Sequence, residues 1–466
     1  MQFTLRPKLS LRSLAVVSLT GLALSLAACG GPVGGGGQGG QQEEQQQDRG
    51  SATSGTVNWW GWTPVATETT KAYIEAFNKE YPNIKVNFKL VAIPDWQATI
   101  TPALRSDSGP DVFDNQPGAY VKRYRSFTED LGPAMVKALG SDWTSKVAPA
   151  GVKPLTLDGK LEAVNVGANY AGMLWINKGL FDKYKVKPPT TLDEWVKACE
   201  TFKANKQGCF VQGAAGQGFD KDTLQAISNS VEPGLWSKAS RGEAKWNSPG
   251  IVKALDIWHQ LFTRGIMQPG ALGYQQYPDA NNDFLTGKYA MVMMGTWYTQ
   301  YTTERAMSQA QAGAGVSNAK PFPIVPIAFP NVGGSEPEMF GDSDLTLSVT
   351  KKAKNKAAAI AFATWMATSK EAQQIAANQL DAIPGLIGVK ANFDEIKLVD
   401  EKVQRAPVEE LLQKLPKVTE PRFAEISQDV QTAVFEAQQA VATGKSTPQQ
   451  AAETLQKAAE AAKANE

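Results

Sequence analysis

The chain is short of the residues on which several kinds of active site depend. Its 466 residues include three cysteines and one histidine, His259. One histidine leaves little scope for histidine-based catalysis, and it makes a four-ligand zinc site with two cysteines incomplete without carboxylates. The nucleophile elbow G-x-S-x-G, the zinc motif HExxH and the Walker loop are absent from the sequence. The sequence therefore disfavours the hydrolase classes that these motifs define.

Net charge is also nearly absent. The 47 lysines and arginines almost balance the 46 aspartates and glutamates, which leaves a formal net charge of +1. A balanced surface gives no argument for nucleic acid or another polyanion as a partner.

The N-terminal segment is read as a signal peptide over residues 1–29. A basic stretch leads into an apolar run over residues 14–26, which is shorter than the ~20 residues that span a bilayer. The run ends in LAAC, which resembles the lipobox of bacterial lipoproteins. That resemblance implies that Cys29 becomes the acylated first residue of a membrane-anchored chain. The alternative is an ordinary cleavage site beside an accidental cysteine.

Residues 30–55 form a segment of glycine, glutamine and other polar residues with almost no apolar side chains. Such a composition cannot build a core, so the segment is expected to act as a flexible tether. The folded body begins near Thr56, and its length predicts two or three domains.

Cys199 and Cys209 are the two cysteines of the folded body. They lie close together in a chain that carries an export signal, which favours a short-loop disulfide.

Strand and helix patterns alternate from Thr56 onward. After TVNWW comes a helical pattern, in which Tyr73 and Phe77 share one face with Ile74 and Tyr81. An alternating strand, IKVNFKLVAI, a helix, WQATITPALRSD, and a short strand, PDVFDN, follow. This order predicts a parallel sheet covered by helices, with ligands bound beyond the carboxyl ends of the strands, where the loops 60–64 and 114–118 lie.

Several motifs occur in an order that resembles the family 1 extracellular solute-binding proteins of ABC importers. They are DGK at residues 158–160, Pro-Pro-x-Thr followed by Asp-Glu-Trp at 188–195, DFLTGKYAMVMMGTW at 283–297, the strand and helix at 345–373, and the Ile-Pro turn before GLIGV. Thr191 and Glu194 also form a capping box that opens a helix. Each motif is weak alone, whereas their order is specific.

The resemblance implies an α/β fold of the periplasmic-binding-protein type, with two lobes joined by crossing strands (type II) that close on ligand by a hinge. Lobe one would comprise residues 56–167 and 340–378, and lobe two residues 168–339 and 379–466. The implied function is that of the binding component of an ABC importer. It would capture a sugar, in particular an oligosaccharide, outside the cytoplasmic membrane and deliver it to the permease as a monomer without a cofactor.

A sugar offers hydroxyls to polar side chains and C–H faces to aromatic rings, so its site combines tryptophan or tyrosine with carboxylates and amides. Of the three tryptophans in WWGW, Trp59 or Trp60 is expected in the core, because consecutive strand residues face opposite sides. Trp62 is expected at the cleft edge. The resemblance puts a stacking tryptophan at Trp297, where the alternative is a cap on the strand end. The candidate ligand-binding residues are Trp62, Thr63, Asp114, Asn115, Gln116, Asn169, Tyr170, Trp236, Trp297, Tyr298 and Asp342.

A structural role without ligand contact remains the alternative for several of these residues. Asp114 or Asn115 could cap the following helix. Asn169, Tyr170 and Asp342, with Asp344, could be hinge residues without ligand contact. For the whole protein, the rivals are a glycoside hydrolase, which needs a pair of carboxylates, and a binding protein for a solute other than a sugar.

Overall fold

The computed structural model describes residues 54–64, 67–216, 218–318 and 320–464. The predicted signal peptide with Cys29, and nearly all of the predicted tether, lie outside these residues.

Two main sheets organise the described residues. The first has six strands in the order β12-β6-β11-β3-β1-β2, and the second has four in the order β10-β7-β9-β8. The strands are β1 (Ser54–Gly61), β2 (Asn83–Leu90), β3 (Val112–Asn115), β4 (Thr156–Leu157), β5 (Lys160–Leu161), β6 (Val164–Ala171), β7 (Met173–Asn177), β8 (Gly208–Val211), β9 (Tyr289–Met293), β10 (Ile324–Ala328), β11 (Phe340–Val349) and β12 (Ile383–Pro384).

The alternation predicted near the N-terminus is confirmed. Strand β1 pairs in parallel with both β2 and β3, and the helices α1 and α2 connect them in sequence. Strands β11 and β12 join the same sheet in antiparallel orientation beside β3 and β6. Because β1 and β3 run in parallel, the loops that follow them meet at one edge of the sheet.

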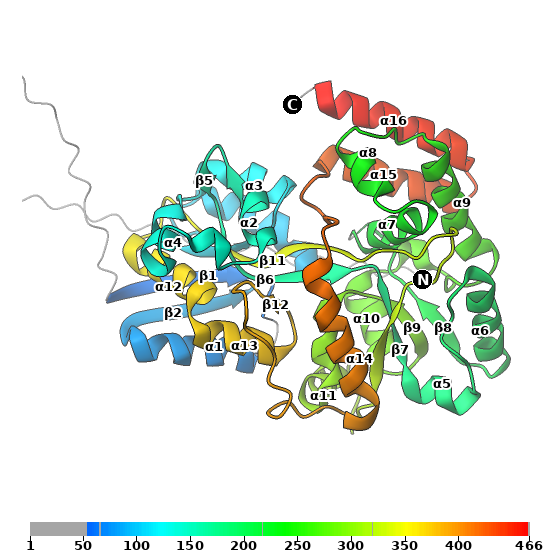
Figure 1. Ribbon diagram of the computed structural model, residues 1–466, viewed down its shortest axis with the longest axis horizontal. Coiled ribbons are helices and arrows are strands. Elements are labelled where there is room, and N and C mark those ends of the chain that lie inside the picture. The colour runs from blue at the N-terminus through cyan, green and yellow to red at the C-terminus, as the bar shows by residue number, and fades with distance from the viewer. Residues whose placement is uncertain (1–53, 65–66, 217, 319, 465–466) are drawn as a thin grey trace, which may run out of the picture. The chain divides into compact units, whose positions relative to one another are not determined.

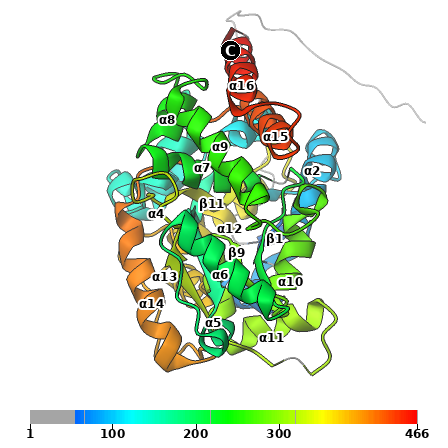
Figure 2. The ribbon, with the colours of Figure 1, turned by 90° about the vertical axis from the view of Figure 1, so that its right-hand side faces the viewer.

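Helices cover both sheets (Figure 1). Helix α12 packs on the first sheet and α1 lies beside β2, whereas α5, α6 and α10 pack on the second sheet and α14 lies on β10. Figure 2 shows α15 and α16 side by side near α9. The helices are α1 (Thr67–Glu80), α2 (Trp96–Arg105), α3 (Ala119–Tyr124), α4 (Gly132–Leu139), α5 (Lys178–Tyr184), α6 (Leu192–Ala204), α7 (Phe219–Val231), α8 (Leu235–Ser240), α9 (Pro249–Thr263), α10 (Asn281–Leu285), α11 (Glu304–Gly313), α12 (Lys356–Thr368), α13 (Lys370–Gln379), α14 (Glu401–Lys414), α15 (Gln428–Ala442) and α16 (Pro448–Ala464).

The chain passes between the two sheets three times. It leaves the first sheet after β6, where Gly172 alone separates β6 from β7 and has a φ of 91° that favours glycine. It returns between β10 and β11, and it leaves again after β12 toward α14. Residues 168–171 and 383–384, which the sequence analysis placed in lobe two, pair within the first sheet.

One of the two adjacent tryptophans of β1 lies in the core, as the sequence predicted. Trp59 is fully buried against Phe88 and Phe362, and Trp195, Trp258 and Trp365 are buried as well. The ring of Trp60 is only partly buried and lies under the ammonium of Lys89, 3.7 Å from the ring centroid. Strand alternation thus places Trp59 and Trp60 on opposite faces of the sheet, and Trp60 packs partly buried against the cluster of Trp62 and Trp96.

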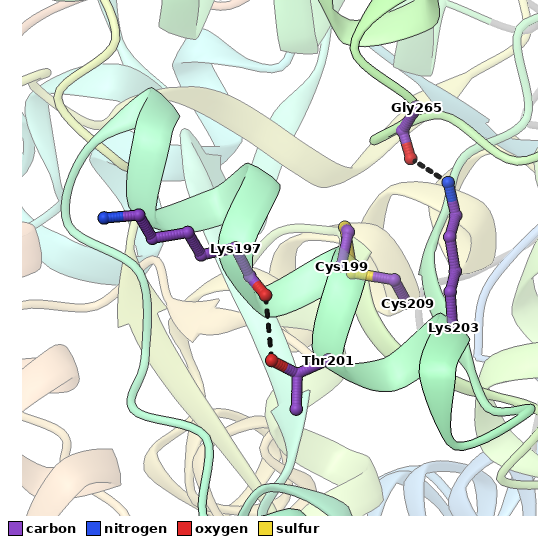
Figure 3. Close-up of a disulfide and its surroundings, with 6 residues drawn as sticks. All are labelled: Lys197, Cys199, Thr201, Lys203, Cys209 and Gly265. Atoms are coloured by element: carbon purple, nitrogen blue, oxygen red, sulfur yellow. Dashed lines mark hydrogen bonds between the residues drawn. A yellow bond between two sulfur atoms is a disulfide. The ribbon is translucent and has the colours of Figure 1, made fainter.

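The predicted start of α6 and the predicted disulfide are both confirmed. The hydroxyl of Thr191 accepts a hydrogen bond from the backbone N–H of Glu194 at 3.2 Å, and the Glu194 carboxylate accepts one from Thr190 N–H. Cys199 on α6 bonds to Cys209 on β8, with their Cα atoms 5.0 Å apart (Figure 3). The bond ties the helix to the strand that it covers.

Candidate functional site

Asp114 organises the loop that follows β1. Its carboxylate accepts hydrogen bonds from Trp59 Nε1–H at 2.9 Å, from Trp62 N–H at 2.9 Å and from Thr63 N–H at 3.2 Å. Burial raises the pKa of this carboxyl well above its usual value, although the three donors oppose the rise. A Cβ at Gly61 would lie 2.5 Å from both Asp114 oxygens. Glycine is therefore needed here, and the carboxylate holds the loop.

Trp62 lies above the same strand ends. Its side chain is 8% exposed and meets Trp96 edge to face, with ring centroids 4.7 Å apart. Trp62 belongs to a small core cluster that also contains Ile100 and Phe113. Most of its surface is therefore used in packing, and only a small part faces outward.

A polar cluster forms where β6 and β11 run side by side. Asp344 Oδ2 accepts a hydrogen bond from Asn169 Nδ2 at 2.9 Å, and its other oxygen accepts one from the side-chain amide of Gln116. Thr296 connects the cluster to the second sheet, because its hydroxyl donates to Asn169 Oδ1 at 3.0 Å and accepts from Tyr170 N–H at 3.0 Å. Residues from β6, β11 and the loops after β3 and β9 thus converge here.

Aromatic rings on the second-sheet side define what we call the aromatic wall, Phe219, Tyr277 and Trp297. Trp297 lies in the 3₁₀ helix η8 (Thr296–Thr302), is 9% exposed and donates a hydrogen bond from Nε1 to the Tyr277 hydroxyl at 3.0 Å. The rings of Tyr277 and Trp297 lie 5.5 and 6.0 Å from that of Phe219. The guanidinium of Arg422 lies 4.6 Å from the centroid of Trp297.

Asp381 connects the loop after β1 with the aromatic wall. Its carboxylate accepts hydrogen bonds from the Thr63 hydroxyl at 3.0 Å and from Gln300 Nε2 at 2.6 Å. The same Gln300 amide nitrogen donates to the backbone carbonyl of Trp297 at 2.9 Å. Burial, with Asp344 adding repulsion, raises the pKa of Asp381 to about 6. Thr63, Asp381, Gln300 and Trp297 therefore form a continuous chain of contacts.

Other predicted residues have partners of their own. Asn115 donates to Ser348 Oγ at 3.0 Å within the first sheet. Tyr298 is fully buried and donates to Asn281 Oδ1 at 2.7 Å. Trp236 is 2% exposed and packs edge to face on Trp246, with ring centroids 5.0 Å apart. These three side chains are held by packing or by partners within the protein.

The Asp342 carboxylate faces the backbone of the segment after η9 (Leu415–Lys417). It accepts hydrogen bonds from the N–H groups of Arg422, Phe423 and Ala424. Burial raises its pKa to about 6, against the effect of these donors. Asp342 thus attaches the segment that carries Arg422 to strand β11.

The structure brings together Trp62, Thr63, Asp114, Gln116, Asn169, Tyr170 and Trp297 through the contacts above. Six further residues that contact this set were not predicted from the sequence: Phe219, Tyr277, Thr296, Gln300, Asp381 and Arg422. Asp381 lies two residues before the Ile-Pro turn, which was recognised only as a family feature. Thr296 stands beside Trp297 in the 283–297 motif, and the remaining four carried no local signal.

Within the ranges described, no group of three or more histidine, cysteine, aspartate and glutamate side chains could hold a metal ion. The helices of those ranges also include none that is long and apolar enough to cross a membrane.

Two sheets with three crossovers between them, and polar and aromatic side chains meeting beside the crossover strands, are the arrangement implied by the resemblance to solute-binding proteins. Residues 63–373 match the family model of bacterial extracellular solute-binding proteins, and the chain belongs to this family.

The curated relatives are distant. The chain is 24% identical to the multiple sugar-binding protein of Streptococcus mutans over 66% of its own length and 69% of that protein. It is also 24% identical to the melibiose/raffinose/stachyose-binding protein MelE of Bacillus subtilis, over 70% and 72% of the two chains. An uncharacterised ABC transporter extracellular-binding protein of Pyrococcus horikoshii is 25% identical, and the chain spans 56% of its length.

Solved structures share the fold. A chitin oligosaccharide binding protein superimposes with a TM-score of 0.70 at 20% identity, covering 88% of this chain and 99% of the other. Maltose-bound MalE3 of T. maritima gives a TM-score of 0.67 at 19% identity, covering 87% and 99%. The predicted periplasmic-binding-protein-like α/β fold is therefore confirmed.

Proposed function

We propose that the protein is the substrate-binding component of an ABC importer and that it captures a saccharide between its two sheets. The observation that carries this proposal is the chain of contacts from Thr63 through Asp381 and Gln300 to Trp297. It puts carboxylate and amide groups next to an aromatic wall, which is the combination that sugar hydroxyls and C–H faces need.

The residues proposed to contact the ligand fall into two groups. Gln116, Asn169 and Asp344 supply polar groups at the crossover strands, and Trp297 with Tyr277 supplies the aromatic surface. Trp62 and Thr63 would contribute from the loop after β1, and Tyr170 from β6. Asp114 would act by holding that loop.

We further propose that the two sheets belong to two lobes, divided near the boundaries given by the sequence, 56–167 with 340–378 and 168–339 with 379–466, except that residues 168–171 and 379–384 go with lobe one because β6 and β12 pair in the first sheet. Hinge motion at the three crossovers would open and close the site. The polar contacts of Asp381 with Gln300 and of Gln379 with Arg305 join side chains of the two lobes. Such contacts can be broken and remade at low cost, as a cleft that opens requires.

The remaining assignments concern the location of the protein. Cys29 is proposed as the site of lipid attachment, and residues 30–55 as the tether that holds a monomeric body at the membrane, facing the periplasm or the exterior. The partners would be the permease subunits of the importer. Replacement of Cys29 by serine should release the protein from the membrane fraction, and unchanged membrane association would contradict the anchor.

A thermal-shift screen tests the binding function. Melibiose, raffinose, maltotriose, xylotriose and chitotriose are a suitable panel. A ligand present at 100 times its dissociation constant adds roughly 2.7 kcal/mol of stability, which moves the melting temperature by several degrees. We expect at least one saccharide to do so, and prolonged incubation to leave it intact. Release of shorter sugars would instead favour the glycoside hydrolase.

A further inference from the structure

A buried ionic network lies behind the aromatic wall. Arg422 is 6% exposed, and its guanidinium donates to both oxygens of Asp222, with nitrogen–oxygen distances of 2.6, 3.0 and 3.1 Å. The ammonium of Lys221 lies 2.9 Å from Asp222 Oδ1 and donates to the Arg422 carbonyl at 2.9 Å. A buried ion pair adds little net stability compared with apolar residues of the same size. Its presence here therefore suggests a role other than stability.

The network places the Arg422 guanidinium beside three rings, with centroids at 4.5 Å for Phe423, 4.6 Å for Trp297 and 5.8 Å for Phe219. The Arg422 guanidinium lies 4.6 Å from the Trp297 centroid, a distance at which a cation is attracted to the face of an indole. Burial disfavours the charge of Arg422, but Asp222 more than compensates and raises its pKa above the usual value. The guanidinium is therefore charged under all conditions in which the protein is folded.

The Trp297 ring also has neighbours besides Arg422, among them Phe219, whose ring centroid lies 6.0 Å away. Nε1 is fixed by the Tyr277 hydroxyl at 3.0 Å, and the benzene part of the indole lies against Gly295, where a Cβ would come within 2.1 Å of the ring. Arg422 itself is held from two directions, by Asp222 through its side chain and by Asp342 through its backbone N–H at 2.9 Å. The guanidinium is thus a fixed support for the indole.

We propose that Arg422 is a positioning residue that sets the orientation of the Trp297 indole for saccharide stacking without itself forming the ligand surface. This inference rests on the proposed saccharide-binding function. The planar fork of arginine is required, because a lysine keeps the charge but neither pairs with both Asp222 oxygens nor lies flat on a ring.

The test measures the affinity of wild-type protein and of Arg422→Lys for each sugar of the panel, melibiose, raffinose, maltotriose, xylotriose and chitotriose. Each protein is labelled with 5-fluorotryptophan, and the Trp297 fluorine resonance is assigned by its loss in Trp297→Phe. We expect Arg422→Lys to shift the Trp297 resonance in the free protein and to weaken binding of the best panel sugar about tenfold, which corresponds to 1.4 kcal/mol. The resonance of Trp365, which belongs to the core of the first sheet and donates to Glu80, should not move.

Arg405→Lys is the matched control. Arg405 forms exposed pairs with Glu401 and Glu409 on α14, so its replacement removes arginine–carboxylate pairing without touching the segment that carries Arg422. Affinity should be unchanged in this variant. If Arg422→Lys does not fold, the double variant Asp222→Asn/Arg422→Gln removes both charges while keeping hydrogen-bonding groups, and it should also bind the sugar about tenfold more weakly.

The outcomes separate the two proposals. A wild-type protein that binds no sugar of the panel contradicts the proposed function. Wild-type binding with unchanged affinity in a folded Arg422 variant overturns the role of Arg422 alone. Failure of both Arg422 variants to fold would make the ion pair a requirement of folding and would also overturn a positioning role.

Discussion

The side-chain amide of Gln300 donates a hydrogen bond to the carboxylate of Asp381, with 2.6 Å between nitrogen and oxygen. The two residues are 81 positions apart. Gln300 follows the second sheet in η8, and Asp381 precedes strand β12 of the first. This bond therefore joins the two proposed lobes. Its acceptor is a carboxylate whose charge can be titrated.

The titration of Asp381 predicts a pH dependence of stability. Its folded pKa is raised from 3.8 to about 6, so the folded state binds the proton more tightly than the unfolded chain. The stabilisation is complete below pH 3.8 and is lost as the pH rises to about 6. Asp381→Asn should remove this loss. The free energy of unfolding of the variant, relative to that of wild type, should therefore be about 1–3 kcal/mol higher at pH 7.5 than at pH 4.5.

Urea unfolding at four pH values between 4.5 and 7.5 measures this effect. Residues facing Asp381 are Tyr73, Tyr277, Tyr301 and Asp344. The control is Asp107→Asn, since the Asp107 side chain is 95% exposed. A stability difference between Asp381→Asn and wild type that stays constant across this range would contradict the prediction.

Gly61 should tolerate no side chain. The Cβ of an alanine would lie 2.5 Å from the carboxylate oxygens of Asp114, which hold Trp62 and Thr63. Gly61→Ala is expected to cost about 1–3 kcal/mol of stability, the usual effect of overpacking, and to weaken saccharide binding. Gly273→Ala is the control, because nothing lies within 4 Å of its Cβ position. Equal melting temperatures and affinities in the two variants would show that the loop has room to move.

The disulfide should contribute measurably to stability. The bonded cysteines are separated by 10 residues, and closing a loop of this size in the unfolded chain gives roughly 3 kcal/mol in the chain-entropy model. Denaturant unfolding of the protein and of Cys199→Ser/Cys209→Ser should differ by that amount. Two titratable thiols in the unreduced, denatured protein would refute the bond.

Trp297 and Trp258 should separate binding from packing. Trp258 is fully buried and donates to the Gln438 carbonyl at 3.1 Å, between α9 and α15. We expect Trp297→Phe to weaken sugar binding by about 1 kcal/mol, because it loses ring area and the bond to Tyr277. Trp258→Phe should lower the melting temperature and leave the affinity unchanged. A Trp297→Phe protein that is less stable yet binds normally would assign Trp297 to the core.

The sequence predicted those features that depend on local pattern. Residue spacing predicted helix α1 and strand β3, and the Thr-x-x-Glu pattern predicted the cap of α6. Two nearby cysteines in a chain with an export signal predicted the disulfide. The structure contains all four features. The motif order predicted the family. Strand alternation also predicted that the neighbouring tryptophans Trp59 and Trp60 would face opposite sides.

The parts of the site that depend on distant contacts were not predictable in this way. Periodicity does not reveal that the Asp114 carboxylate accepts hydrogen bonds from Trp59, Trp62 and Thr63, because the register between β1 and β3 decides this. Arg422 lies in a segment without clear helix or strand periodicity. Its pairing with Asp222 depends on the tertiary fold. Trp236 was a candidate for ligand binding, but in the fold its ring packs on that of Trp246.

The most direct test of the account is an equilibrium titration of the purified protein with the best saccharide of the panel, followed by chromatography of the recovered sugar. The account predicts saturable, reversible binding that Trp297→Phe weakens by about 1 kcal/mol, and a sugar recovered unchanged. No heat of binding with any saccharide of the panel, or recovery of shortened products, would contradict it.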